Sequence, residues 1–113
     1  MSEGGERDFL RDVQEAVRRI EAYLGNMPYE VFLKDTKTQD AVIRNLEIIG
    51  EASKNLSGEF RTRHPDIPWR SMAGVRDRLI HDYFGVNLDI VWHIVTVELP
   101  TVGSRIAEVL SEE

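Results

Sequence analysis

Residues 41–56 read AVIRNLEIIGEASKNL, and the spacing of their apolar side chains decides the fold. Apolar residues recur here every three or four positions, which is the period of an α-helix. They form two stripes, one of Val42, Leu46, Ile49 and Leu56 and the other of Ala41, Ile48 and Ala52. So wide an apolar face predicts that a helix over about residues 38–56 is buried on more than one side, either in the centre of a bundle or against another subunit.

The chain before this helix follows the same period. A second amphipathic helix is predicted over about residues 6–24. Its apolar stripe consists of Phe9, Val13, Ala16, Val17, Ile20 and Leu24. Gly25 and Asn26 are expected to end this helix, and Pro28 stands where a short helix at about 29–34 would begin.

The chain after the central helix is broken at Ser57-Gly58, and a short helical turn is expected to follow as far as Arg63. The sequence HPDIPW at 64–69 contains two prolines and predicts a rigid extended connection. Its last residue, Trp69, is expected to pin this loop to the core. A further helix is predicted over about 70–83. Its inward-facing residues are Met72, Val75 and Leu79.

The last segment, about 88–111, is again predicted to be helical. Gly85 is expected to end the preceding helix and Asn87 to cap this one. Pro100 lacks a backbone N–H and clashes with the preceding turn, so a kink or a break is expected near 96–100.

These features together predict an all-α, up-and-down helical bundle with four main helices plus short ones. Residues 1–5, MSEGG, are expected to form a disordered tail, and residues 6–113 a single domain. The 113-residue chain has no cysteine, which excludes disulfides and thiolate metal sites. No apolar run is long enough to span a bilayer and the first residues do not resemble a secretory signal, so we expect a cytoplasmic protein without a membrane partner.

Charge is distributed unevenly along the chain. The net charge of −6 argues against a general nucleic-acid coat. Residues 61–83 nevertheless contain five arginines against three aspartates, together with His64 and His81. A cationic patch on an acidic body can still attract a polyanion, because exposed charges act mainly within a Debye length. The alternative interpretation is an ordinary solvated helix face.

The cationic stretch contains RDRLIHDY, residues 76–83, in which Arg76, His81 and Tyr83 can all take part in phosphate chemistry. On a regular helix Arg76 and Tyr83 lie on nearly the same face, whereas His81 points roughly 140° away from Arg76. The three cannot meet at one phosphate unless the helix unwinds near His81 or residues from two chains come together. This geometry favours a site at a helix end and at a dimer interface.

Arginine and histidine suit the cleavage of RNA without a metal ion. Attack of a 2′-hydroxyl on the neighbouring phosphate needs a base, an acid and a cation for the growing negative charge. Histidine can serve in either proton transfer, and arginine offers phosphate a planar fork of donors. A symmetric dimer would supply two copies of His81, one for each transfer. His64, His81 and His93 lie far apart in sequence, so neither a metal site nor another cofactor is predicted.

The chain resembles the HepT-like toxin family of the HEPN superfamily. The segment 76–83 matches the family signature R-x(4)-H-x-Y. The wider likeness lies in AVIRNLEIIGEASKNLS (41–57), HPDIPWRSMAGVRDRLIHDYFGV (64–86), DIVWHIV (89–95) and ELP (98–100), and it covers nearly the whole chain.

The resemblance implies a homodimeric, metal-independent ribonuclease with its active site in the cleft between subunits. Such proteins are the toxin half of a type VII toxin–antitoxin pair. By resemblance, Arg76 and His81 are catalytic, while Arg70 and Arg78 from the same cationic stretch are further candidates for substrate binding. The implied antitoxin is a minimal, MntA-like nucleotidyltransferase that silences the toxin by transferring AMP to Tyr83.

Other interpretations of the same residues remain open. The dimer could be a non-catalytic partner of a nucleotidyltransferase, in which Arg76 and His81 bind nucleotide without cleaving RNA. It could also be a purely structural helical dimer. Tyr83 taken alone is more often a half-buried packing aromatic. An RNase assay with alanine variants separates these possibilities.

Overall fold

The computed structural model describes residues 3–79 and 85–112, and within these ranges every regular element is a helix. The prediction of an all-α fold is therefore confirmed. In chain order the elements are α1 (Glu3–Leu24), α2 (Tyr29–Phe32), α3 (Thr36–Lys54), α4 (Gly58–Arg63), α5 (Trp69–Ala73), α6 (Val75–Leu79), α7 (Leu88–His93), the π-helix η2 (Ile94–Glu98) and α8 (Leu99–Ser111).

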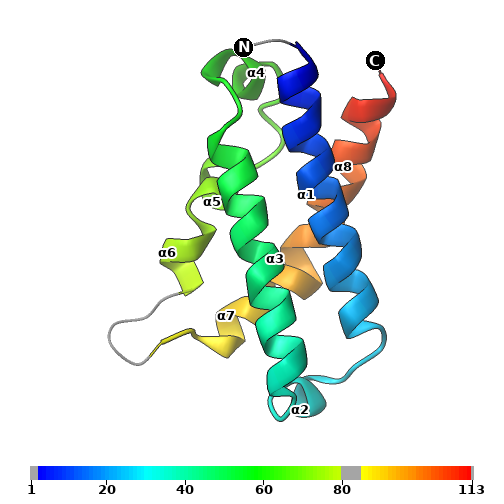
Figure 1. The fold of residues 1–113 in the computed structure, drawn as a ribbon, viewed down its shortest axis with the longest axis vertical. Coiled ribbons are helices and arrows are strands. Elements are labelled where there is room, and N and C mark those ends of the chain that lie inside the picture. Colours follow the sequence, from blue (N-terminus) through cyan, green and yellow to red (C-terminus); the bar gives the residue numbers. More distant parts are fainter. Residues whose placement is uncertain (1–2, 80–84, 113) are drawn as a thin grey trace.

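The helices run alternately up and down the molecule (Figure 1). α1 and α3 lie side by side in opposite directions, and α2 forms the turn between them. The chain then returns through α5 and α6, which pack on α3, and rises again through α8, which packs on α1. Of the helices described, α1, α3 and α8 exceed ten residues, so the expected count of four main helices is not confirmed.

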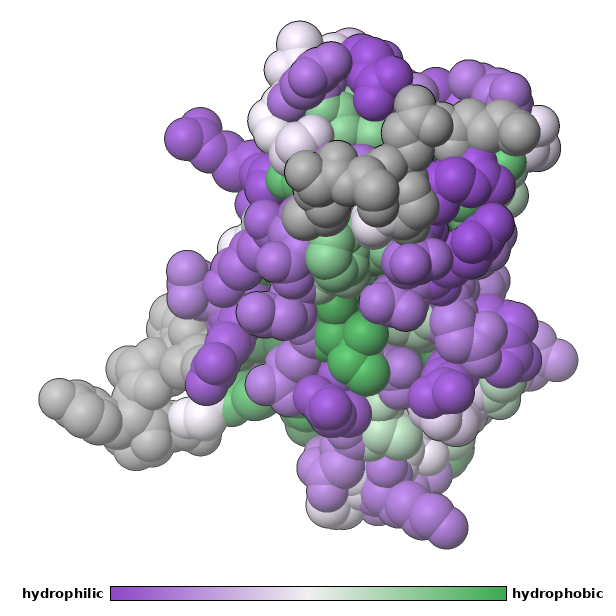
Figure 2. All heavy atoms as spheres, turned by 45° about the horizontal axis from the view of Figure 1, so that its top comes forward, coloured by the Kyte–Doolittle hydropathy of each residue, from purple (hydrophilic) through white to green (hydrophobic). Residues whose placement is uncertain are grey.

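The core lies where these helices face one another. On α3, the first predicted stripe is wholly buried at Val42, Leu46 and Ile49, whereas Ile48 of the second stripe is only partly covered. The predicted burial of α3 on more than one side is therefore found in part within a single chain, because α1 packs on one side of α3 and the α5–α6 segment on another. The face of the molecule drawn in Figure 2 is mainly hydrophilic, with hydrophobic side chains in a narrow band across it.

The N-terminal boundaries differ slightly from those expected. α1 begins at Glu3, three residues before the expected start at Glu6, so Gly4 and Gly5 lie in its first turn. Glycine is tolerated there because the N–H groups of a first helical turn have no partner within the helix. α3 begins at Thr36, before the expected start at residue 38, because Asp35 caps it: its carboxylate accepts the backbone N–H of Thr38 at 3.0 Å.

The helix predicted over 70–83 is interrupted. α5 ends at Ala73, and α6 begins after Gly74, whose carbonyl accepts bonds from the backbone N–H of both Asp77 and Arg78. Because glycine destabilises the interior of a helix, interrupting the helix at Gly74 costs little stability. Trp69 at the start of α5 is buried and donates its indole N–H to the carbonyl of His64 at 2.9 Å, as expected of a residue that pins the loop.

The irregularity expected near Pro100 takes the form of a π-helix. η2 spans Ile94–Glu98, and Pro100 lies in the first turn of α8. The missing N–H of Pro100 removes a backbone bond one turn back, and the wider turn of η2 accommodates that loss. The break thus begins two residues earlier than the sequence indicated. Asn87 caps α7 as expected, accepting from the backbone N–H of Asp89 and Ile90.

Candidate functional site

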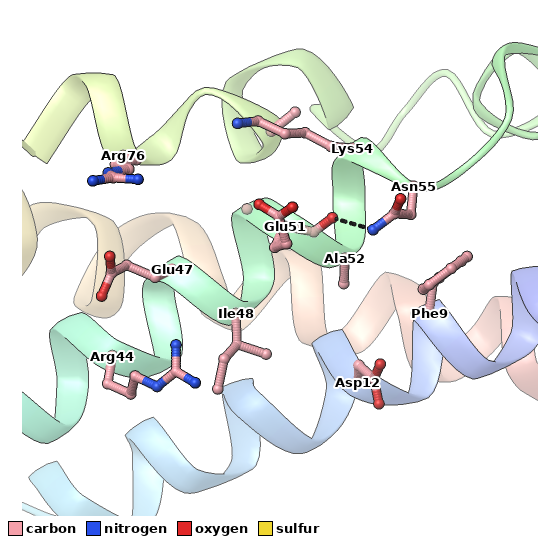
Figure 3. A pocket seen from close by; sticks show the side chains of 12 residues that line it. Phe9, Asp12, Arg44, Glu47, Ile48, Glu51, Ala52, Lys54, Asn55 and Arg76 are labelled. Carbon is pink, nitrogen blue, oxygen red and sulfur yellow. Dashed lines mark hydrogen bonds between the residues drawn. The ribbon is translucent and has the colours of Figure 1, made fainter.

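A hollow of about 460 Å³ opens on the outer face of α3 (Figure 3). α3 forms its floor, α1 contributes one rim and the α5–α6 segment the other. Arg76 of α6 stands on this second rim, across from Glu47 of α3. The remaining lining side chains include Phe9, Asp12, Arg44, Ile48, Glu51 and Lys54.

The charged side chains of the hollow are not paired with one another. Arg44, Lys54 and Arg76 make no hydrogen bond or ion pair through their side chains with the part of the chain that the structure describes. The same holds for the three carboxylates of the lining, Asp12, Glu47 and Glu51. Unpaired cations around a hollow provide donors that a ligand phosphate can use, because arginine in particular matches phosphate oxygens.

The rim that carries Arg76 is held close to α3 by a glycine. A Cβ atom on Gly50 would lie 3.0 Å from Cγ1 of Val75 and 3.3 Å from the carbonyl oxygen of Met72. Only a residue without a side chain allows α3 and the α5–α6 segment to approach so closely. Val75 directly precedes Arg76, so this contact fixes where Arg76 stands.

Arg78, two residues further along α6, faces a different part of the molecule. Its guanidinium donates to both carboxylate oxygens of Glu98, at 2.9 and 2.7 Å, and to Oγ of Ser71 at 2.8 Å. Its hydrogen bonds lower the pKa of Glu98, against the opposing effect of burial, and Glu98 in turn raises the pKa of Arg78. Among the residues lining the hollow, Arg78 does not occur.

The other predicted site residues are placed as follows. Arg70 on α5 is exposed and does not line the hollow that contains Arg76. His81 and Tyr83 lie outside the described residues, so their predicted roles remain predictions. The chain segment that contains them leaves α6 at Leu79 and returns at Asn87, where the backbone N–H of Asn87 donates to the carbonyl of Leu79 at 2.9 Å.

Two kinds of feature are absent from residues 3–79 and 85–112. No three histidine, aspartate or glutamate side chains are grouped so that they could bind a metal ion. None of the helices in these ranges has the length and apolar character that crossing a membrane requires.

Sequence reasoning missed Arg44 and Lys54. They belong to α3, which ends before the cationic stretch begins, and the expected patch was confined to residues 61–83. A signal was present, since both lie on the polar face of α3, outside its two apolar stripes. Only the packing of α6 on α3 places them around the same hollow as Arg76.

Comparison with known proteins extends these observations. A family model described as "Ribonuclease HepT-like" matches residues 13–109. A protein named "Probable ribonuclease HepT" from Thermococcus cleftensis is 50% identical over 99 residues, which cover 88% of this chain and 90% of the relative.

Two further relatives span most of the chain. "Putative RNase MJ0127" from Methanocaldococcus jannaschii is 46% identical over 106 residues, covering 94% of this chain and 88% of the relative. "Putative RNase TTE0752" from Caldanaerobacter subterraneus is 44% identical over 108 residues, covering 95% and 96%. No solved structure matches the chain. The match over residues 13–109 and the identity to these relatives show that the chain belongs to the HepT-like ribonuclease family.

Proposed function

We propose that the chain is a metal-independent endoribonuclease in which Arg76 binds the scissile phosphate of RNA. The observation that carries this proposal is the environment of the Arg76 side chain. It is exposed, has no partner among the described residues, and lies on the rim of a hollow that Arg44 and Lys54 also line. A cation held without a partner is available to stabilise negative charge that develops during cleavage. The names of the relatives, which describe ribonucleases, support the same activity.

The chemistry assigns distinct roles to the motif residues. Arg76 would neutralise the phosphate oxygens as the 2′-hydroxyl attacks, while Arg44 and Lys54 would bind neighbouring phosphates. His81 would transfer protons, and a homodimer would bring two copies of His81 to one cleft, as base and as acid. Sedimentation that gives a monomer at micromolar concentration would contradict this shared site.

The activity can be tested with purified protein and a labelled RNA. Arg76→Ala should lower the cleavage rate by about 10²–10³-fold, since one oxyanion-stabilising donor contributes about that much. His81→Ala should lower it by about 10²–10⁴-fold. Arg18→Ala is the matched control, because Arg18 is an exposed arginine of α1 outside the hollow. Each variant should melt within a few degrees of wild type.

The outcomes separate the candidate activities. EDTA should leave the rate unchanged, and a loss of activity that a divalent metal restores would refute the proposed mechanism. A wild-type protein that binds nucleotide but cleaves no RNA would point instead to a non-catalytic partner of a nucleotidyltransferase.

We further propose that this ribonuclease is the toxin of a type VII toxin–antitoxin pair and acts in the cytoplasm. An MntA-like nucleotidyltransferase antitoxin would transfer AMP from ATP to the hydroxyl of Tyr83. The argument is electrostatic: an AMP phosphate on Tyr83 would compete with RNA phosphate for Arg76 and repel the RNA backbone. The match of residues 76–83 to the signature R-x(4)-H-x-Y, in which Tyr83 is the motif tyrosine, supports this role by resemblance.

This switch can be tested by mass spectrometry. Co-expression with the cognate nucleotidyltransferase should add mass in AMP-sized steps to Tyr83 and not to Tyr23 or Tyr29. Tyr83→Phe keeps the ring but lacks the nucleophilic oxygen, so it should cleave RNA and resist ATP-dependent silencing. Equal silencing of wild type with and without ATP would show that the switch does not act at this tyrosine.

A further inference from the structure

The ion pair between Arg78 and Glu98 differs from most others in the part of the chain that the structure describes. Pairs such as Arg18–Glu15 join neighbouring turns of one helix and are largely exposed, and such pairs contribute little to stability. Arg78 and Glu98 are 20 residues apart, and their side chains are 34% and 28% exposed. Both ends of the guanidinium fork bind the carboxylate, a geometry that fixes orientation as well as distance.

The pair lies at the end of α6, from which the chain continues towards His81 and Tyr83. Arg78 is followed by Leu79, whose carbonyl accepts the backbone N–H of Asn87 at 2.9 Å. The two ends of the segment 80–86 are therefore joined directly. We call this junction, made by Leu79 and Asn87, the neck.

Both sides of the neck are anchored. On one side Arg78 ties α6 to η2 through Glu98 and to α5 through Ser71. On the other side Asn87 caps α7, accepting from the backbone N–H of Asp89 at 3.0 Å. η2 follows α7 directly, so the pair closes a ring that runs from α6 across the neck through α7 to η2 and back.

The π-helix is what brings Glu98 into this ring. A wider turn changes the direction in which the following side chains project, relative to a regular α-helix, and π-turns are frequent at functional sites. Glu98 is the last residue of η2. Its carboxylate also lies 3.6 Å from Nε2 of His93, on the preceding turn, so Glu98 faces two basic side chains.

We propose that Arg78 and Glu98 are positioning residues that hold the neck, and that Arg78 does not bind RNA. This inference rests on the proposed ribonuclease function. Arg78 lies between Arg76 and His81 in the sequence, so it fixes the backbone that connects the phosphate-binding cation to the proton-transfer group. A misplacement of about 1 Å in such a site lowers the rate of the chemical step by up to about 10²-fold.

The pair can be tested by a charge exchange. Glu98→Gln and Arg78→Glu should each lower kcat for RNA cleavage at least about tenfold and leave KM within about twofold. The double variant Arg78→Glu with Glu98→Arg restores the pair with reversed charges, and it should recover most of the lost kcat. An Arg78 that binds RNA predicts the opposite: KM would rise in both variants that lack Arg78, and the exchange would restore nothing.

A matched control is available in the ion pair of Arg105 with Asp66. It also joins distant segments, α8 and the loop before α5, but it does not touch α6 or the neck. Asp66→Asn should therefore leave kcat within about twofold of wild type. If kcat fell equally in Asp66→Asn and Glu98→Gln, the loss would reflect lower overall stability and not the position of the neck. That result would overturn the proposal.

Amide hydrogen exchange tests the neck without any RNA. Glu98→Gln should speed exchange at the Asn87 amide at least about tenfold, while the Asp66→Asn control leaves it unchanged. An unchanged rate in Glu98→Gln would refute the role of the pair whether or not the protein cleaves RNA. A wild-type protein that lacks cleavage, yet shows the faster exchange in the variant, would instead refute the proposed function alone.

Discussion

Replacing Gly50 by alanine tests whether the close approach of α3 to the α5–α6 segment holds the site together. The added Cβ would lie 3.0 Å from Cγ1 of Val75, 3.3 Å from the carbonyl oxygen of Met72 and 3.7 Å from that of Ala73. Two of these three neighbours are backbone atoms. Val75 is buried and β-branched, so it has few rotamers into which it could move. The helices must therefore separate by a few tenths of an ångström.

Two effects of opposite sign set the magnitude. Alanine in a helix interior is favoured over glycine by about 1 kcal/mol, and this alone would stabilise the variant. Overpacking a well-packed contact typically costs about 1–3 kcal/mol. The difference predicts a net loss of about 1 kcal/mol in the free energy of unfolding, or a fall in Tm of about 4 °C for a chain of this size.

Urea unfolding followed by circular dichroism measures this difference. Gly58→Ala is the matched control, because a Cβ at Gly58 would have nothing within 4 Å. Its unfolding free energy should stay within about 0.5 kcal/mol of wild type. A Gly50→Ala variant that is more stable than wild type would show that the α5–α6 segment moves aside easily to accept the added methyl group. The argument that Gly50 positions Arg76 would then fail.

Two further changes test the segment around the neck. Because hydrogen bonds from Arg78 lower the pKa of Glu98 below its usual 4.5, the pair stabilises the fold above that pH and loses this contribution as the pH falls through the lowered pKa. Wild type should therefore lose more stability than Glu98→Gln between about pH 5 and pH 3. Parallel acid-denaturation curves for the two proteins would contradict a stabilising role of the ion pair. Asn87→Ala removes the cap of α7 and should lower the free energy of unfolding by about 1 kcal/mol, measured in urea; Asn26→Ala, at an exposed position, should not.

Periodicity predicted the fold well wherever a helix buries one regular stripe. Phe9 of α1 is only partly buried, but the other residues of the predicted α1 stripe and the first stripe of α3 are buried as expected. So are Met72, Val75 and Leu79 in the interrupted segment after Trp69. This works because residues three or four positions apart lie on one face of a helix. The boundaries were less accurate, since a cap such as Asp35 depends on one side chain rather than on a pattern.

The breaks in the helices were harder to predict than the helices. Gly74 interrupts the segment 69–79, but a glycine inside an apolar pattern is compatible with either a break or a continuous helix. Pro100 predicted an irregularity, yet its form is a π-turn placed before the proline. Which turn forms depends on contacts made across the fold, here including the hydrogen bonds that Arg78 donates to Glu98, and no local pattern contains that information.

The candidate site was predicted only as far as local spacing allows. Arg76 is exposed at the hollow, in agreement with a role in phosphate binding, while Arg44 and Lys54 come from a helix that the motif does not include. A hollow assembled from three elements distributes its charges over distant parts of the sequence. Only the packing of α6 on α3, made close by Gly50, brings them together.

The cationic stretch itself shows why charge along a sequence is a poor guide to a surface. Arg76 and Arg78 are two positions apart, and residues with that spacing point to opposite sides of a helix. One arginine therefore stands over the hollow without a described partner, and the other is bound by Glu98 of η2. Because the same rotation that exposes Arg76 carries Arg78 inward, the two roles are linked. In the proposed mechanism, fixing Arg78 to η2 also orients Arg76, so a substitution at either residue is expected to reduce cleavage for a different physical reason.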